Sequence, residues 1–164
     1  AARVAAEARG VFGDDAEALI DTYARNRPGA KGSDLLVAFM TDHIFRIPVI
    51  RVAETQHAQG RDAFMYLFTY ESQVMDFLKA CHALELPFVF GTLDAGAMLT
   101  GNGDDRQALS DSMVEAWTRF ARTGDPGWPA YDPTTRPVMR FDVMESGIVH
   151  DPDAEERLLW EGRA

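Results

Sequence analysis

The spacing of apolar and polar residues predicts a chain built mainly from helices. Apolar positions recur every three or four residues in several stretches, which is the period of one face of a helix. The predicted helices cover residues 1–11, 14–27, 33–45, 48–60, 106–123 and 152–162. Asp14 or Asp15 is expected to cap the second helix, and Ser33 with Asp34 the third. Pro48 is expected to open the fourth, because the first turn of a helix tolerates a missing N–H.

The predicted helix at residues 106–123 has the clearest pattern. One stripe of its surface is apolar, at Leu109, Met113, Trp117 and Phe120. Gly124 supplies a C-terminal stop for this helix. The helix at residues 33–45 is apolar on most sides, and we therefore predict that it is buried.

One strong strand stands out between the helices. Residues 62–72 read DAFMYLFTYES, which is short, aromatic-rich and apolar on both faces, as in a central strand covered by helices. Residues 137–142 and 146–151 predict short late strands, and residues 72–81 and 91–105 are expected to be loops. This order of elements predicts part of an α/β fold. Because one strong strand cannot form a sheet alone, we expect further strands outside this chain.

Composition and charge exclude several classes of partner. The 164 residues carry a formal net charge of -10, which argues against binding to nucleic acid or to an anionic membrane surface. Cys81 is the single cysteine, so no intramolecular disulfide and no cysteine-based metal site can form. No apolar run reaches the ~18 residues of a membrane span. The chain begins without Met, already in a helical pattern, and we expect it to start inside a larger protein.

His82 is the main candidate for chemistry. It lies in the segment KACHALELPFVFG, between the predicted strand and an apolar run. Reactive groups gather on loops beyond strand ends in α/β sheets, and histidine carries protons near neutral pH, although a loop histidine is also often structural. Cys81 is interpreted as a small buried thiol. Glu85 either meets the positive end of a following helix dipole or belongs to a polar network behind an active site.

A complete hydrolase site is missing from these residues. The five serines lie outside any Gly-x-Ser-x-Gly sequence, and no HGG-type oxyanion motif occurs. His43, His57 and His150 lack metal-ligand spacing and are interpreted as surface or core residues.

The segment around His82 resembles the histidine region of the type-B carboxylesterases, the α/β-hydrolase family that includes cholinesterases and para-nitrobenzyl esterases. In that family the catalytic histidine is followed by a small residue, then by Glu two positions on, and by an apolar run ending in Phe-Gly. His82, Ala83, Glu85 and Phe90-Gly91 match this pattern, with Ala83 in place of the commoner glycine. The segments TDHIFRIPVIRVAETQHAQG, DAFMYLFTY, MVEAWTRFARTGDPGWPAYDP and VMRFD resemble later parts of the family in the same order.

The resemblance implies that residues 1–164 are the C-terminal part of one α/β-hydrolase domain. The nucleophile, oxyanion hole and acid would then lie on an N-terminal remainder of the same protein, the partner of this chain. The implied function is hydrolysis of small carboxylic esters by a serine esterase, with His82 as catalytic histidine, Glu85 as site support and no metal or organic cofactor. The chain alone is expected to be inactive.

Two alternatives remain open from the sequence. Phe77, Leu78 and Leu84 flank His82 and either line an apolar pocket or pack in the core. The chain is part of an enzyme, or a non-catalytic interaction module derived from a hydrolase, as some members of the family are adhesion proteins, or a self-standing helical domain of unrelated function. The last reading would require the predicted strand at residues 62–72 to find partners within the chain or in a dimer. The physiological ester, compartment and oligomeric state stay open.

Overall fold

The chain divides into two compact units. The computed structural model describes residues 2–162. The first unit joins the residues up to Gln59 with those from Pro152 onward, and the second unit is Gly60–Asp151. The first is helical, whereas the second contains the sheet together with His82.

The helices of the first unit come from both ends of the chain. They are α1 (Ala2–Phe12), the 3₁₀ turn η1 (Gly13–Asp15), α2 (Ala16–Asn26), α3 (Gly32–Thr41), the π-helical turn η2 (Asp42–Arg46), α4 (Ile47–Ala58) and α8 (Ala154–Leu158). Trp160, just after α8, packs edge-on against Phe12 at 4.7 Å between ring centroids and stacks on Phe39 at 5.6 Å. An aromatic core thus joins the two ends of the chain.

The two predicted helix caps have different outcomes. The carboxylate of Asp34 accepts a hydrogen bond from the backbone N–H of Lys31 at 2.8 Å, at the start of α3. At the start of α2, in contrast, the Asp15 side chain makes no capping hydrogen bond. The backbone turn η1 leads directly into α2, and the N–H of Ala16 bonds to the carbonyl of Gly13 instead.

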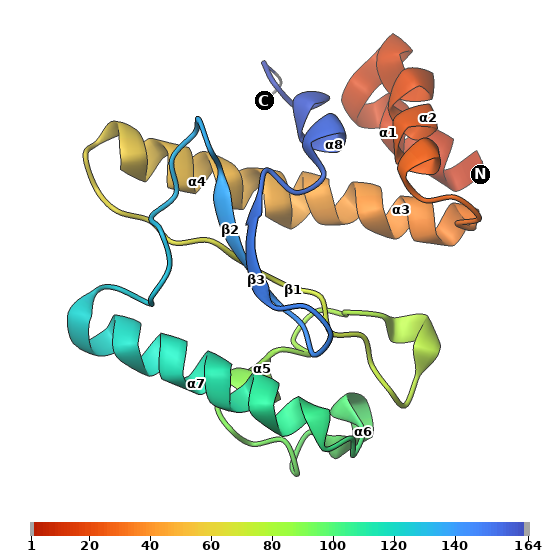
Figure 1. The fold of residues 1–164 in the computed structure, drawn as a ribbon. Helices are drawn as coiled ribbons and strands as arrows, with labels where there is room; N and C mark the ends of the chain where they lie inside the picture. The colour runs from red at the N-terminus through yellow and green to blue at the C-terminus, as the bar shows by residue number, and fades with distance from the viewer. Residues whose placement is uncertain (1, 163–164) are drawn as a thin grey trace. The chain divides into compact units, whose positions relative to one another are not determined.

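Pro48 does not open a new helix. α3, η2 and α4 continue as one long helical rod (Figure 1), with Pro48 inside it, at the second residue of α4. A proline inside a helix removes one N–H and crowds the preceding turn. Here that turn widens to π-helical geometry, in which the N–H of Ile47 bonds to the carbonyl of Asp42 five residues back.

The predicted burial of residues 33–45 is wrong. Phe39 and Asp42 are buried, but Val37 is 65 % exposed and Ile44 and Phe45 are about half exposed. This part of the rod therefore buries Phe39 and Asp42 but leaves Val37 and Ile44 largely exposed.

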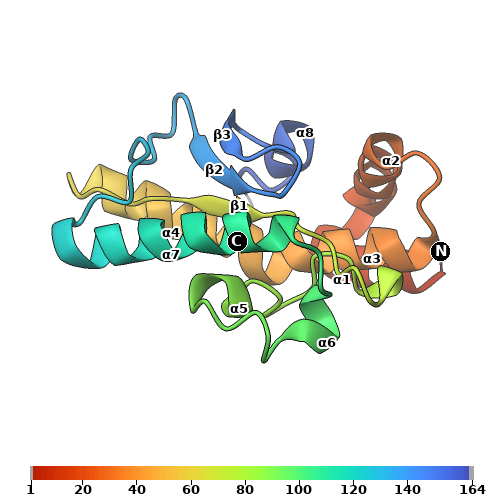
Figure 2. The ribbon, with the colours of Figure 1, turned by 60° about the horizontal axis from the view of Figure 1, so that its bottom comes forward.

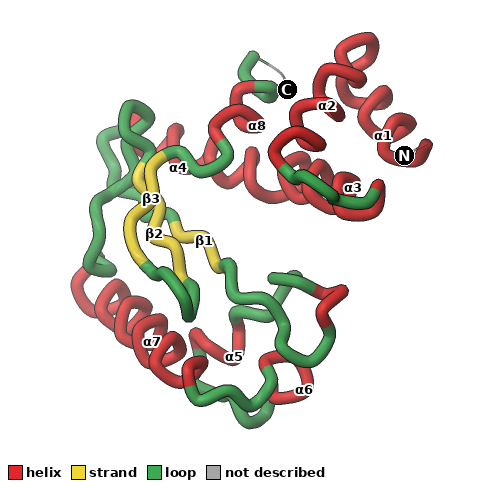
Figure 3. Tube along the Cα trace, turned by 45° about the vertical axis from the view of Figure 1, so that its right-hand side comes forward, coloured by secondary structure: helices red, strands yellow, loops and turns green. Residues whose placement is uncertain are grey.

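The second unit contains a three-stranded sheet in the order β1-β2-β3 (yellow in Figure 3). Its strands are β1 (Tyr66–Phe68), β2 (Pro137–Phe141) and β3 (Gly147–His150). β1 runs parallel to β2, with Tyr66 opposite Met139, and β3 runs antiparallel to β2. The predicted strand at residues 62–72 is thus only three residues long, and its residues are half-buried. Among the described residues, β1 forms one edge of the sheet.

The helices of the second unit include a short one that lies alongside a long one (Figure 2). They are the 3₁₀ turn η3 (Asp76–Leu78), α5 (Leu86–Val89), α6 (Ala97–Thr100) and α7 (Asp105–Thr123). Residues 91–105 were predicted as a loop but contain α6. Two hydrogen bonds to Thr100, at the end of α6, hold it in place. Its carbonyl accepts a bond from the Tyr70 hydroxyl at 2.6 Å, and its hydroxyl accepts one from Arg106 at 2.9 Å.

α7 buries only part of its predicted stripe. Leu109 and Met113 are buried in the core of the second unit, whereas Trp117 and Phe120 remain about half exposed. The predicted C-terminal stop is confirmed, since Gly124 adopts a φ of 76° and its N–H bonds to the carbonyl of Phe120 at 2.8 Å.

Candidate functional site

His82 lies on the surface in a tight turn between β1 and α5. The N–H of Leu84 donates a hydrogen bond to the carbonyl of Cys81 at 3.1 Å, which closes a four-residue β-turn with His82 in its second position. Ala83, in the third position, has a φ of 67°. The turn places the imidazole at the surface, where a proton acceptor can meet a substrate.

The turn is anchored at its C-terminal side by the core of the second unit. Leu84 is completely buried in a cluster that includes Tyr70, Phe88 and Met113. The Tyr70 and Phe88 rings approach to 4.9 Å between centroids. A turn that ends on a close-packed side chain of this kind cannot shift without opening a void.

Buried hydroxyl groups fix the segments on both sides of the turn. The Ser110 hydroxyl of α7 donates to the carbonyl of Phe88 in α5 at 2.8 Å. The Ser72 hydroxyl donates to the carbonyl of Leu99 at 2.7 Å and accepts from the N–H of Met75 at 3.2 Å. Sequence reasoning missed these serines because their partners are backbone groups, which no residue pattern reveals.

Glu85 lies three residues after His82, immediately before α5. It occupies the N-cap position without a side-chain capping hydrogen bond, and it is half-buried. Burial raises the pKa of the Tyr66 hydroxyl on β1, and the negative charge of Glu85 raises it further. The carboxylate of Glu85 therefore acts electrostatically on the strand that precedes the His82 turn.

The three predicted pocket residues lie in different environments. Phe77 in η3 is 81 % exposed, and Leu78 beside it is half-buried. Leu84 is part of the core, which favours the packing role that the sequence left open for it. Cys81 was interpreted as a small buried thiol; it is a free thiol that packs against the same core but is only partly buried.

An aromatic hollow in the second unit is formed by residues that the sequence did not single out as a group. It has a volume of about 260 Å³ and its main walls are Phe64, Tyr66, Trp117, Phe120 and Trp128. Phe64 meets Phe120 edge-on at 5.9 Å between ring centroids, and Tyr66 meets Trp117 in the same way at 6.2 Å. His82 is not among the residues that line this hollow.

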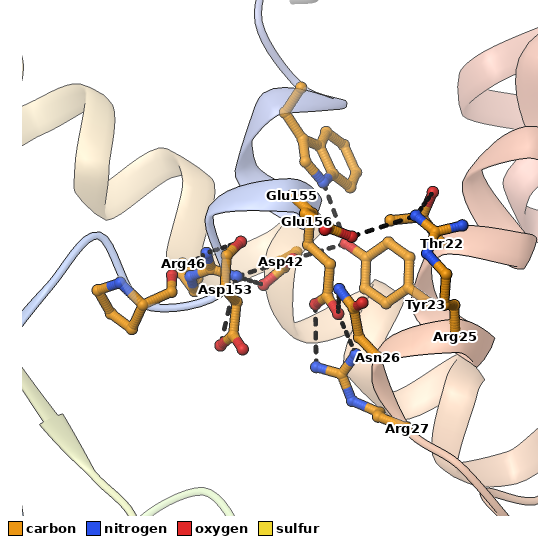
Figure 4. A network of polar contacts seen from close by, with 12 residues as sticks. Thr22, Tyr23, Arg25, Asn26, Arg27, Asp42, Arg46, Asp153, Glu155 and Glu156 are labelled. Carbon is orange, nitrogen blue, oxygen red and sulfur yellow. Dashed lines mark hydrogen bonds and ion pairs between the residues drawn. The ribbon is translucent and has the colours of Figure 1, made fainter.

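The first unit contains a buried network of charged groups (Figure 4). Arg27 of the loop after α2 forms a two-pronged ion pair with Glu156 of α8, and Asn26 donates to the same carboxylate at 3.2 Å. The hydroxyl of Tyr23 donates to Asp42 at 2.5 Å, and Arg46 donates to the other oxygen of Asp42 at 3.0 Å. Each carboxylate has a cationic partner, which is typical of a structural network.

Burial shifts the pKa values of two groups in this network. Burial raises the pKa of Asp42, although Arg46 and Tyr23 oppose the rise. Burial and the neighbouring Asp42 charge also raise the pKa of Tyr23 far above its ordinary range. Tyr23 therefore remains a donor at all ordinary pH values.

No group of three or more His, Cys, Asp or Glu side chains within residues 2–162 is arranged to hold a metal ion. Likewise, none of the helices described here is long and apolar enough to cross a membrane.

His43 stacks on Trp160 at 5.4 Å between ring centroids, and the Nδ1 of His150 lies 2.8 Å from the carbonyl oxygen of Thr135.

Comparison with known proteins assigns the family. The model of the carboxylesterase family matches residues 11–160, which is most of the chain and includes His82. The chain belongs to the carboxylesterase family. The carboxylesterase resemblance of the His82 segment is thereby confirmed at the level of the family.

The similar carboxylesterases include bacterial and animal proteins. The chain is 36 % identical over 152 residues to the para-nitrobenzyl esterase of Bacillus subtilis (strain 168), an alignment covering 87 % of this chain and 29 % of that protein. It is 32 % identical over 134 residues to the medium-chain fatty acyl-CoA hydrolase precursor of Anas platyrhynchos, covering 74 % and 23 %. A crystal structure of a Geobacillus stearothermophilus carboxylesterase superimposes with a TM-score of 0.76 at 39 % identity, covering 88 % and 32 %.

The similarity to these carboxylesterases also assigns the fold. The chain has the α/β architecture of a portion of the α/β-hydrolase fold, as predicted, with more helix than sheet. The chain spans less than a third of the length of these relatives.

Proposed function

We propose that this chain is the C-terminal portion of a serine carboxylesterase and that His82 is its catalytic histidine. The proposal rests on the position of His82 in this chain, which belongs to the carboxylesterase family. His82 lies exposed in a turn that follows a strand of the parallel pair β1-β2 and ends on the buried Leu84. An exposed imidazole on a rigid support is what proton transfer to a substrate requires.

The proposed chemistry moves one proton in each half-reaction. His82 accepts the proton of a serine hydroxyl as the serine oxygen bonds to the ester carbonyl carbon. The imidazolium then returns this proton to the leaving alcohol as the carbon–oxygen bond breaks, which leaves an acyl-enzyme. Water repeats the cycle and releases the acid. Glu85 would support this site electrostatically, and no metal or organic cofactor is required.

The serine, the acid and the oxyanion donors would belong to a preceding part of the same domain. Two features of the chain support this proposal. Its relatives are more than three times as long as the segment that they share with it. Apolar side chains on the α3–α4 rod, such as Val37 and Val52, are also exposed, as expected of surfaces that pack against further polypeptide.

Small carboxylic esters are the proposed substrates. Of the three candidate pocket residues, Phe77 and Leu78 are the ones available to contact an acyl or alcohol group, because Leu84 is part of the core. Replacing both with Ala in the intact esterase should change its chain-length preference. An unchanged ester profile would remove them from the pocket.

The decisive experiment is His82→Ala in the polypeptide that carries this chain together with its upstream segment. Hydrolysis of a short-chain chromogenic ester should fall at least about a thousandfold, because no other base would activate the serine. His150→Ala is the matched control, since His150 is also exposed but lies in β3, and it should stay within about twofold. Wild-type rates for His82→Ala would contradict the proposal.

The upstream sequence tests the alternative function. A Gly-x-Ser-x-Gly segment with an HGG-type stretch before it would support the esterase. Replacement of that serine by an unreactive residue would favour a non-catalytic interaction module with the same fold.

A further inference from the structure

We propose that Ser72 is a positioning residue for Phe77, because its hydroxyl and its backbone N–H hold both ends of the short turn η3 that presents the Phe77 ring. The inference rests on the proposed function, in which Phe77 is available to contact an ester substrate. It gives a role in substrate selection to a buried serine that belongs to no nucleophile motif.

The segment between β1 and the His82 turn folds back on itself at Ser72. The backbone N–H of Ser72 donates to the carbonyl of Lys79 at 3.0 Å, which closes a loop over residues 72–79. An ion pair of Glu71 with Lys79 lies at the same point, at 3.2 Å, but its side chains are 55 % and 65 % exposed, and such pairs contribute little. Ser72 is only 3 % exposed, so the closure of the loop depends mainly on this serine.

The hydroxyl of Ser72 makes three further hydrogen bonds. It donates to the carbonyl of Leu99 in α6 at 2.7 Å. It accepts from the N–H of Met75 at 3.2 Å and from the N–H of Val74 at 3.4 Å. A serine hydroxyl has one proton to donate and two lone pairs, so all of its capacity is used here. Removal of this oxygen would release the start of the loop and would take a donor away from the Leu99 carbonyl.

Phe77 lies between the two backbone segments that Ser72 holds. Met75, bonded to the Ser72 hydroxyl, directly precedes η3, and Lys79, bonded to the Ser72 N–H, directly follows it. Within η3 the N–H of Leu78 donates to the carbonyl of Met75 at 2.8 Å. The Phe77 ring is 81 % exposed and gains little from packing, so the backbone of η3 determines where it lies.

The start of the loop is also fixed to the second unit through α6. Tyr70 is buried and donates to the last carbonyl of α6 at 2.6 Å, next to the Leu99 carbonyl that Ser72 binds. The two side chains thus satisfy carbonyls at the C-terminal end of a helix, which lack partners within the helix. Gly101 follows directly, and a Cβ atom there would come within 2.9 Å of the Cβ of Gln73. The base of the loop is therefore held on a close-packed support.

The first test measures the selectivity between longer and shorter esters in the esterase that carries its upstream segment. Two kcat/KM ratios cover the acyl and the alcohol side of the substrate: para-nitrophenyl hexanoate over acetate, and hexyl acetate over methyl acetate. Phe77→Ala should lower one of these ratios at least about fivefold, because contact with several methylene groups is lost. Ser72→Ala should lower the same ratio at least about threefold, with kcat for the shorter ester within about twofold of wild type. If either variant left both ratios unchanged, the proposal would be overturned.

A double mutant separates positioning from a general structural effect. Because Ser72 acts through Phe77, Ser72→Ala combined with Phe77→Ala should match the ratio of Phe77→Ala alone within about twofold. Effects that multiply would show that Ser72 acts independently of Phe77. Ser110→Ala is the matched control, since Ser110 is a buried serine of the same unit that donates to the carbonyl of Phe88 at 2.8 Å. It should leave both ratios within about twofold, and an equal fall in this variant would also overturn the proposal.

A second measurement needs no substrate. In the same wild-type protein, the amides of Met75 and Leu78 should exchange hydrogen at least about tenfold more slowly than in an unstructured peptide of the same sequence. Ser72→Ala should accelerate both at least about fivefold, whereas Phe77→Ala should leave them protected. Unprotected amides in the wild type would overturn the proposal even if Ser72→Ala fails to fold, and unchanged exchange in Ser72→Ala would overturn it even in a protein that hydrolyses no ester. Activity retained by His82→Ala would instead refute the assignment of His82.

Discussion

Replacement of Arg27 by Met offers a direct test of the buried ion pair in the first unit. The change keeps most of the apolar length of the side chain but removes its charge and both of its bonds to Glu156. Glu156 is completely buried and would retain one hydrogen bond, from Asn26. A buried carboxylate that has lost its cationic partner in this way is unfavourable.

The expected loss follows from the burial of the two partners. Removing one member of a buried ion pair costs about 3–5 kcal/mol, because the other charge stays behind. The Arg27 side chain is 32 % exposed, so water can reach part of the vacated space. We therefore expect the lower end of the range, a decrease of about 3 kcal/mol in the free energy of unfolding.

The neighbouring ion pair provides a matched control. Arg25 pairs with Glu155 at 3.1 Å between the same two segments, but the two side chains are 62 % and 61 % exposed. Exposed pairs of this kind contribute about 0–1 kcal/mol. Arg25→Met should therefore change the free energy of unfolding by less than about 1 kcal/mol.

Trp160 provides the signal for the measurement. It is buried in the first unit, where its indole N–H donates to the Tyr23 hydroxyl at 3.1 Å. In a background with Trp117→Phe and Trp128→Phe, fluorescence during urea unfolding reports the first unit alone, because the chain has three tryptophans. Equal losses for Arg27→Met and Arg25→Met would refute the reasoning that burial makes the difference.

Three further predictions address the second unit and the pH dependence of the first. Leu84→Ala should cost about 2–5 kcal/mol in urea unfolding, against less than about 1 kcal/mol for Leu86→Ala, because Leu84 is in the core and Leu86 is 45 % exposed; similar losses would contradict the assigned core. Ser110→Ala should lower the free energy of unfolding by about 1–2 kcal/mol, because it removes a buried hydrogen bond. Ser112 on the same helix is exposed and should tolerate Ala, and thermal melts of both variants test the difference. Burial raises the pKa of Asp42 above its ordinary 3.8, so the folded state binds this proton more tightly than the unfolded state does. The stabilisation that results is fully present below pH 3.8. It is lost as the pH rises through the raised pKa. As the pH falls from 7 to 4, the free energy of unfolding of wild type should therefore rise relative to that of Asp42→Asn, which cannot titrate. A difference between the two proteins that does not vary with pH would show that Asp42 has the same pKa in the folded and unfolded states.

The sequence determined most of the longer helices and the family, but it was less informative about burial. Local signals sufficed for α7, where the apolar stripe and Gly124 are both short-range features. The segment around His82 likewise carried the carboxylesterase resemblance without any structure. Helix propensity, capping and turn residues act over a few positions, and a sequence therefore displays them directly.

Only the tertiary structure decided which of the predicted elements form and which of their residues are buried. The exposure of Val37, the continuous rod through Pro48 and the helix α6 depend on contacts between segments far apart in the sequence. The ion pair of Arg27 with Glu156 joins residues 129 positions apart, and no local pattern marks either residue as a partner. The φ of Ala83 is a similar case, because alanine rarely adopts such a conformation unless packing imposes it. Long-range packing selects among the local options that a sequence permits, and in this chain that selection sets the turn that presents His82.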